Sequence, residues 1–115
     1  MIAQLRPAEF DTWCTQARAT GLSPVVLDVR EAWELQTASV KAGPDFTLMH
    51  IPMGLVPARL QDLPTDTPIA CLCHHGARSQ RVALFLAERG YTRVVNIAGG
   101  IDAWSRERDP SVPFY

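Results

Sequence analysis

One segment constrains the fold of this chain more than any other: a short apolar run that leads through a loop into an amphipathic helix. The run is "PIACLC", the loop is "CHHGARS" at 73–79, and apolar residues then recur at helical spacing until Gly90. A short apolar run after a proline indicates a buried strand, and a glycine at the end of a helical pattern is typical of a helix terminus. The loop that carries Cys73 therefore joins a strand to a helix.

Further short strand and helix patterns lie before and after this segment. Strands are predicted at "VVLDV", "FTLMHI" and "RVVNI", and helices over 7–20, at "LVPARLQDL" and at "IDAWSRER". The strand at 46–51 lies in a loop-rich crossover, because the region from Val40 to Pro57 contains several glycines and prolines. Strands that alternate with helices predict a mostly parallel sheet with helices on both faces.

Length and composition limit what the chain can do. Its 115 residues are the size of one ordinary domain, so we expect a single domain over 1–115. It is 20% charged with a formal net charge of −1, which attracts neither nucleic acid nor a membrane surface. The apolar runs are far shorter than the roughly 20 residues of a membrane span. With no signal-peptide pattern at the start, we expect a cytoplasmic location and no nucleic-acid or membrane partner.

The chain has three cysteines, Cys14, Cys71 and Cys73. An odd count without a secretory feature favours reduced thiols over disulfides. The spacing of Cys71 and Cys73 differs from that of a CxxC pair, so no metal site is expected, and no organic cofactor is implied. Free cysteine is among the most buried residue types, which favours a packing role for Cys14 and Cys71.

Cys73 differs from the other two cysteines in its surroundings. It stands at the carboxyl end of a strand, where open α/β sheets bind their ligands. The following loop and the amino terminus of the next helix offer backbone N–H groups and positive potential to an anion. With Arg78 nearby, these donors are expected to favour the thiolate, the reactive form of cysteine. Gly76 allows the loop to turn and leaves room for a substrate.

At this point the sequence resembles the rhodanese-like sulfurtransferase domain, and the resemblance covers essentially the whole chain. It rests on "LDVRE" at 27–31, "CHHGARS" at 73–79, "NIAGGIDAW" at 96–104 and the tail "DPSVPFY". The resemblance implies a three-layer α/β fold with a mostly parallel five-stranded sheet. It also implies a cysteine that takes a sulfane sulfur from a donor such as thiosulfate, holds it as a persulfide and passes it to a thiophilic acceptor.

The resemblance also implies the roles of single residues. Cys73 corresponds to the sulfur carrier, and Asp28 and Arg30 match a supporting acidic and basic pair. The residues that correspond to the substrate-binding loop are His74, His75, Gly76, Ala77, Arg78 and Ser79. The implied partners are a small sulfur-containing anion as donor and cyanide, a thiol or a protein thiol as acceptor.

Some features depart from the family pattern or carry no assigned role. Only "HIPMG" looks familiar within the segment from Lys41 to Gly54, so the loop near the site is expected to be altered. His50 is expected to be solvated or bonded to the backbone. Trp104 is expected to anchor the last helix, and Gly99 with Gly100 to serve the turn before it. The sequence does not specify the physiological donor and acceptor, the partner proteins, the oligomeric state or the role of the histidine pair.

Two other function classes stay open. A cysteine phosphatase or arsenate reductase also places a thiolate in an amide-lined loop before an arginine, but its loop has one more residue than the four between Cys73 and Arg78. A non-catalytic or sulfur-relay interaction module is the other alternative, since the same fold can be kept when catalytic activity is lost.

Overall fold

A computed structural model describes residues 1–115 and contains one five-stranded sheet in which every strand pairing is parallel. The strand order is β1-β5-β4-β2-β3. The strands are β1 (Ala3–Leu5), β2 (Val25–Asp28), β3 (Thr47–His50), β4 (Ile69–Leu72) and β5 (Val94–Ile97). The predicted α/β fold with a five-stranded sheet is confirmed.

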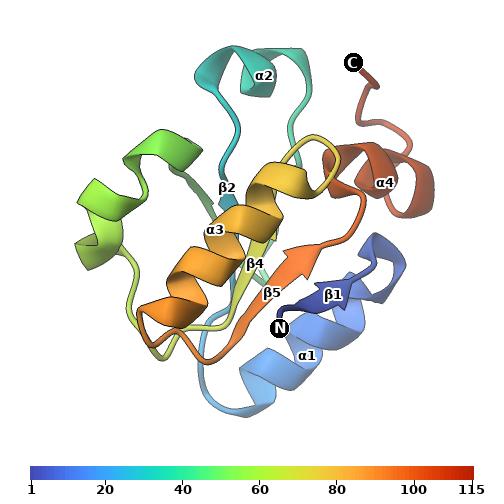
Figure 1. The fold of residues 1–115 in the computed structure, drawn as a ribbon. Helices are drawn as coiled ribbons and strands as arrows, with labels where there is room; N and C mark the ends of the chain where they lie inside the picture. The colour runs from blue at the N-terminus through green and yellow to red at the C-terminus, as the bar shows by residue number, and fades with distance from the viewer.

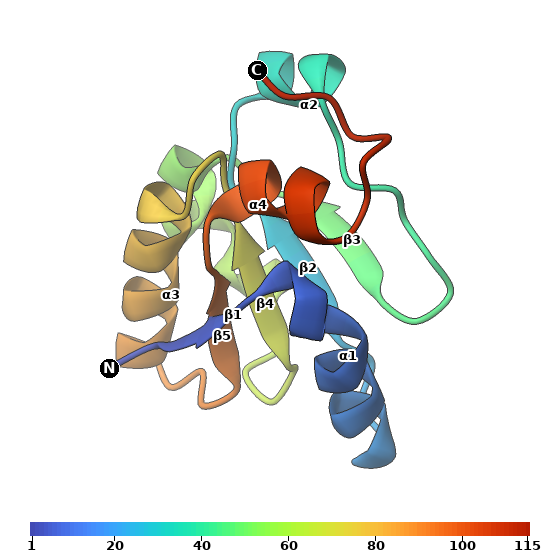
Figure 2. The ribbon, with the colours of Figure 1, turned by 90° about the vertical axis from the view of Figure 1, so that its right-hand side faces the viewer.

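Helices cover both faces of the sheet. The α-helices are α1 (Phe10–Ala19), α2 (Ala32–Thr37), α3 (Ala77–Glu88) and α4 (Gly100–Glu107). Seen edge-on, α3 lies on one face of the sheet and α1 on the other, while α2 stands at the end where the chain terminates (Figures 1 and 2). Three 3-10 helices complete the fold, at Pro7–Glu9, Met53–Leu55 and Pro57–Asp62. No helix is long and apolar enough to cross a membrane.

The central strand β4 shows how the sequence produces this arrangement. Side chains of a strand alternate between the two faces of the sheet. Cys71 belongs to the apolar core beneath α3, whereas Ala70 and Leu72 belong to the core on the α1 side. All four residues of β4 are buried, as expected for a strand in the middle of a parallel sheet. Cys73 continues the alternation and packs in the core beneath α3.

Several local predictions are confirmed. Cys14 and Cys71 are buried in the core, and burial raises the pKa of the Cys14 thiol to about 11. Trp104 is 2% exposed and packs its ring against Phe10 at 4.8 Å between centroids, as an anchor of α4. The strand within 46–51 is β3, on the edge of the sheet.

Other local predictions are corrected. The helix expected over 7–20 begins as the 3-10 turn Pro7–Glu9 before α1. The short helix expected at 55–63 is present as the 3-10 helix Pro57–Asp62, within which Arg59 has non-helical backbone angles (φ −118°, ψ 22°). Strand β1 and helix α2 were not predicted. β1 has three residues of which one is buried, and α2 has six, so both are too short to show a clear periodicity.

Candidate active site

The loop after β4 holds the Cys73 sulfur inside the protein. Cys73 is 1% exposed. Its Sγ accepts a hydrogen bond from the backbone N–H of Gly76 at 3.0 Å and lies 3.2 Å from the Ser79 hydroxyl oxygen. Gly76 is the one loop residue whose amide donates to Sγ in this structure. Hydrogen bonds from uncharged donors to sulfur stabilise negative charge on it.

Gly76 also sets the start of α3. It caps the helix with φ +109°, a conformation that L side chains rarely adopt. The N–H groups of the first helical residues, Ala77 to Ser79, have no acceptor within the helix. The amino terminus of α3, a helix of 12 residues, adds partial positive charge on the same side as Cys73. The loop thus favours an anionic group at the sulfur.

Helix α4 holds the loop from the opposite side. The N–H of Ile101 donates to the Cys73 carbonyl at 2.8 Å, and the N–H of Asp102 donates to the His74 carbonyl at 3.1 Å. Gly100 makes this contact possible, because a Cβ there would lie 2.4 Å from the His74 carbonyl oxygen. The expectation that Gly99 and Gly100 only serve a turn is therefore incomplete: Gly100 is the first residue of α4 and supports the cysteine loop.

Ser79 belongs to a buried network of uncharged polar groups. Its hydroxyl oxygen lies 2.5 Å from Oδ1 of Asn96, which is itself 3% exposed. The amide nitrogen of Asn96 donates to the Gly76 carbonyl at 3.2 Å and to the side chain of Gln4 at 3.0 Å. These bonds orient Asn96, and Asn96 in turn positions the hydroxyl beside Sγ. Asn96 was not predicted as a site residue, because in the sequence it reads as part of a buried strand.

Arg78, at the start of α3, forms an ion pair with a buried carboxylate. Nη1 and Nη2 of Arg78 donate to the two carboxylate oxygens of Glu34 at 2.7 and 2.8 Å. The Glu34 side chain is 3% exposed and that of Arg78 is 32% exposed. The paired arginine lowers the pKa of Glu34 to about 2. The charge of Arg78, which was expected to face an anionic donor, is therefore compensated by Glu34.

Asp28 and Arg30 form a second buried ion pair. Arg30 is fully buried, and its Nε and Nη2 donate to the Asp28 carboxylate at 2.9 and 2.7 Å. Its Nη1 donates to the Ala38 carbonyl at 2.9 Å. The Arg30 backbone carbonyl lies 2.7 Å from the Nε2 atom of His50, so His50 is bonded to the backbone as expected. The pair ties the end of β2 to the segment after α2, which agrees with a supporting role.

The last residue of the chain reaches into the same region. The Tyr115 hydroxyl accepts a hydrogen bond from Arg30 at 3.0 Å and donates to Glu34 at 2.8 Å. Its ring stacks on His74 with 3.8 Å between centroids and an angle of 4° between planes. His74 also stacks on His75, at 3.8 Å. Burial lowers the pKa of His74, so this ring is uncharged near neutral pH.

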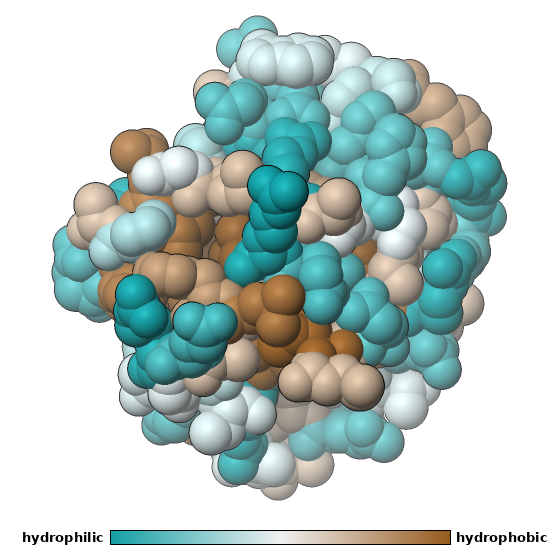
Figure 3. Space-filling model, viewed as in Figure 1, coloured by the Kyte–Doolittle hydropathy of each residue, from teal (hydrophilic) through white to brown (hydrophobic).

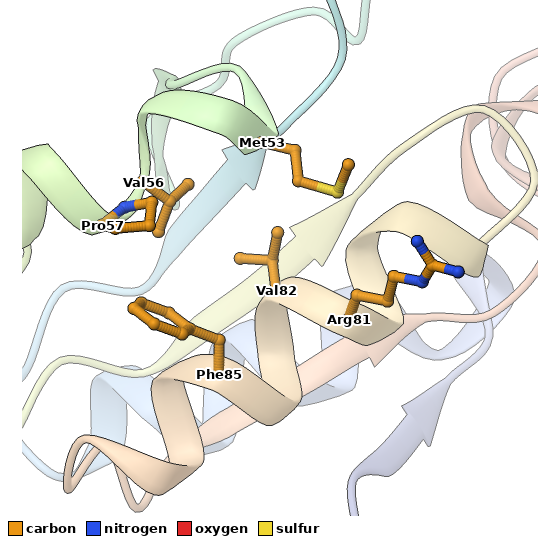
Figure 4. A pocket seen from close by; sticks show the side chains of 6 residues that line it. All are labelled: Met53, Val56, Pro57, Arg81, Val82 and Phe85. Atoms are coloured by element: carbon orange, nitrogen blue, oxygen red, sulfur yellow. The ribbon is translucent and has the colours of Figure 1, made fainter.

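An apolar pocket of about 190 Å³ lies next to the site, between α3 and the two 3-10 helices after β3. Apolar side chains gather on this face of the molecule (Figure 3). Figure 4 shows the lining residues, which are Met53, Val56, Pro57, Arg81, Val82 and Phe85. Val82 follows Ser79 by three residues on α3, so one end of the pocket begins about one helical turn, roughly 5 Å, from the residue that contacts Sγ.

The structure thus brings together most of the residues singled out in the sequence. Cys73, Gly76 and Ser79 form the sulfur site, and Arg78 and His74 border it. Ala77 and His75 are exposed. Four contributors were not predicted: Glu34, Asn96, Gly100 and Tyr115. Asn96, Gly100 and Tyr115 lie in segments that carry the family resemblance, but their contacts with the site could not be predicted, because each of the four acts through a partner more than 15 residues away along the chain.

Comparison with known proteins agrees with this geometry. The family model described as "Rhodanese-like domain" matches residues 12–107. A protein of Allochromatium vinosum named "Sulfurtransferase" is 34% identical over 105 residues, which cover 90% of this chain and 94% of that protein.

Two solved structures are also similar. A rhodanese-related protein from Thermoplasma volcanium is 28% identical with a TM-score of 0.73, over 98% of this chain and 99% of the other. Reduced CoADR-RHD from Bacillus anthracis is 26% identical with a TM-score of 0.75, over 98% of this chain but only 18% of that longer chain. From the family match and the relative of nearly equal length, we conclude that this chain belongs to the rhodanese-like domain family.

Proposed function

We propose that the protein is a sulfurtransferase that carries sulfur as a persulfide on Cys73. The Cys73 thiolate attacks the outer, sulfane sulfur of a donor such as thiosulfate; a new S–S bond forms, and the S–S bond of the donor breaks with its electron pair leaving on sulfite. A thiolate or cyanide acceptor then attacks the terminal sulfur of the persulfide. This step returns the Cys73 thiolate and yields an acceptor persulfide or thiocyanate.

The observation that carries the proposal is the environment of the Cys73 sulfur. Sγ is buried, accepts a hydrogen bond from the Gly76 N–H, and lies beside the Ser79 hydroxyl at the start of α3, which suits a sulfur that alternates between thiolate and anionic persulfide. Relatives named as sulfurtransferases support the same class of reaction. All three cysteines are free, which suits a reducing compartment such as the cytosol.

The phosphatase alternative is disfavoured by Arg78. Phosphoryl transfer needs a cation that binds the transferring group. Here both terminal nitrogens of Arg78 are bound by Glu34, and the loop is one residue shorter than the phosphatase pattern.

Intact mass spectrometry tests the proposal. The reduced protein is treated with thiosulfate or with inorganic polysulfide, desalted and weighed, with Cys73→Ser treated in parallel. We expect the parent protein to gain the mass of one sulfur atom and to lose it again on addition of cyanide, which appears as thiocyanate.

Cys71→Ser is the matched control, because Cys71 lies two residues away and is fully buried without a donor at its sulfur. It should load sulfur like the parent. A parent protein that gains no sulfur from either donor, or a Cys73→Ser variant that gains as much as the parent, would contradict the proposed function.

A further inference from the structure

The charges around Cys73 are balanced in pairs. Arg78 is the only cation that the cysteine loop contributes, and both of its terminal nitrogens are bound by Glu34. Arg30, the other buried arginine, is compensated by Asp28. His74 is uncharged near neutral pH because burial lowers its pKa. Arg81, one turn further along α3, has no carboxylate partner, but it is exposed, and solvent screens its charge.

Arg78 lies in the first turn of α3, next to Ser79, whose hydroxyl oxygen is 3.2 Å from Sγ of Cys73. The charge of Arg78 is therefore placed at the start of the helix that borders the sulfur. A guanidinium without a carboxylate at this place would attract a doubly charged donor more than a singly charged one, because the Coulomb energy is proportional to the charge of the donor. The negative charge of Glu34 cancels the extra attraction that Arg78 would otherwise exert on a doubly charged donor.

Several hydrogen bonds fix the position of the Glu34 carboxylate. Besides Arg78, its carboxylate accepts hydrogen bonds from the Tyr115 hydroxyl at 2.8 Å and from the backbone N–H of Glu31 at 2.8 Å. Three donors and almost complete burial fix the carboxylate in one orientation.

Building on the proposed sulfur transfer, we propose that Glu34 determines which sulfur donor the site accepts: by compensating Arg78, it favours singly charged sulfane donors, such as persulfides and thiosulfonates, over the doubly charged thiosulfate. Thiosulfate can still load Cys73, but without the help of a free arginine.

A pair of donors of nearly equal shape tests this proposal. Thiosulfate and methanethiosulfonate both present a sulfane sulfur on a sulfonyl centre, and a methyl group in the second replaces one charged oxygen of the first. Attack by the Cys73 thiolate gives the same persulfide and releases sulfite or methanesulfinate. The measured quantity is the ratio of kcat/KM for thiosulfate to kcat/KM for methanethiosulfonate, with cyanide as common acceptor. Differences in the donors' intrinsic reactivity cancel when this ratio is compared between variants.

Four forms of the protein change the charge at the site in steps. Glu34→Gln leaves Arg78 uncompensated, Arg78→Gln leaves Glu34 uncompensated, and the double variant restores neutrality. We expect the ratio to rise about five- to tenfold in Glu34→Gln, to fall by a similar factor in Arg78→Gln, and to return to near the parental value in the double variant. A purely structural role of the pair would lower both rates together and leave the ratio constant.

Asp62→Asn is the matched control, because it makes the same type of change in an exposed ion pair with Arg59 away from the site. Its ratio should equal that of the parent. The parent alone gives a second measurement that does not depend on the folding of a variant: with a compensated arginine, its ratio should change little between low and high ionic strength.

The outcomes separate the two proposals. A protein that loads sulfur on Cys73 but shows the same ratio in all four forms, or a parental ratio that falls steeply with salt, would overturn the role of Glu34 and leave sulfur transfer intact. A parent that loads no sulfur from either donor would overturn the proposed function itself, and the role of Glu34 with it.

Discussion

Gly100 is a single residue on which the shape of the cysteine loop depends. Its φ of +60° and the close approach of the Cys73 and His74 carbonyls leave no space for a side chain. Gly100→Ala should therefore destabilise the protein by about 2 kcal/mol or more, from backbone strain and from displacement of the loop. Urea unfolding measures the stability, and the rate of sulfur loading on Cys73 should fall with it.

Gly21→Ala separates the effect of backbone strain from the effect of displacing the loop. Gly21 also has a positive φ, +83°, but a Cβ there would meet no atom within 4 Å. Only the conformational cost remains, about 1 kcal/mol, and sulfur loading should be unchanged. Equal losses of stability in the two variants would show that the contact with the loop contributes nothing.

At the scale of elements, the C-terminal tail contacts residues that border the cysteine loop. After α4 the chain runs back over the end of the sheet to α2 (Figure 2), where the Tyr115 hydroxyl bridges Arg30 and Glu34. Tyr115→Phe keeps the ring on His74 but removes this bridge from two buried charged groups. We expect a loss of stability of about 1 to 3 kcal/mol in chemical denaturation.

Phe114→Leu provides the comparison within the tail. Phe114 is 60% exposed, so its replacement should change stability by less than about 0.5 kcal/mol. If Tyr115→Phe is as mild as Phe114→Leu, the hydroxyl bridge does not hold the tail.

The elements also show what can be read from a sequence. The strands β2 and β4 and the helix α3 were predictable, because each has a continuous buried run or a clear helical spacing. The edge strand β1 and the short helix α2 were not, since their place depends on pairing with β5 and on the Arg78–Glu34 contact. The residues next to Cys73 in sequence predicted the candidate site. The contacts of the residues that hold this loop from a distance could not be predicted, because they depend on how separate segments meet in the fold.

At the scale of the whole molecule, four buried or partly buried charges lie in two pairs at the carboxyl end of the sheet. This arrangement makes stability depend on pH in a defined direction. Arg78, with help from Tyr115, lowers the pKa of Glu34 to about 2, below its ordinary value near 4.5. A lowered carboxyl pKa stabilises the folded state above the ordinary value, and this contribution disappears as the pH falls through the folded value.

Thermal or urea unfolding as a function of pH measures this effect. The parent should lose about 3 kcal/mol from this group alone between pH 5 and pH 2. Glu34→Gln has no such group. It should be less stable than the parent at pH 7, and the difference should shrink toward pH 2. A constant difference across this range would mean that Glu34 does not titrate as the structure indicates.

Part of the support of the cysteine loop acts on its main chain. The carbonyls of Cys73, His74 and Gly76 accept bonds from α4 and from Asn96, while the side chains of His75 and Ala77 point to solvent-exposed positions. Contacts to these carbonyls place no demand on the side chains at positions 75 and 77. Exchange of these two side chains is therefore expected to leave the geometry around the Cys73 sulfur unchanged.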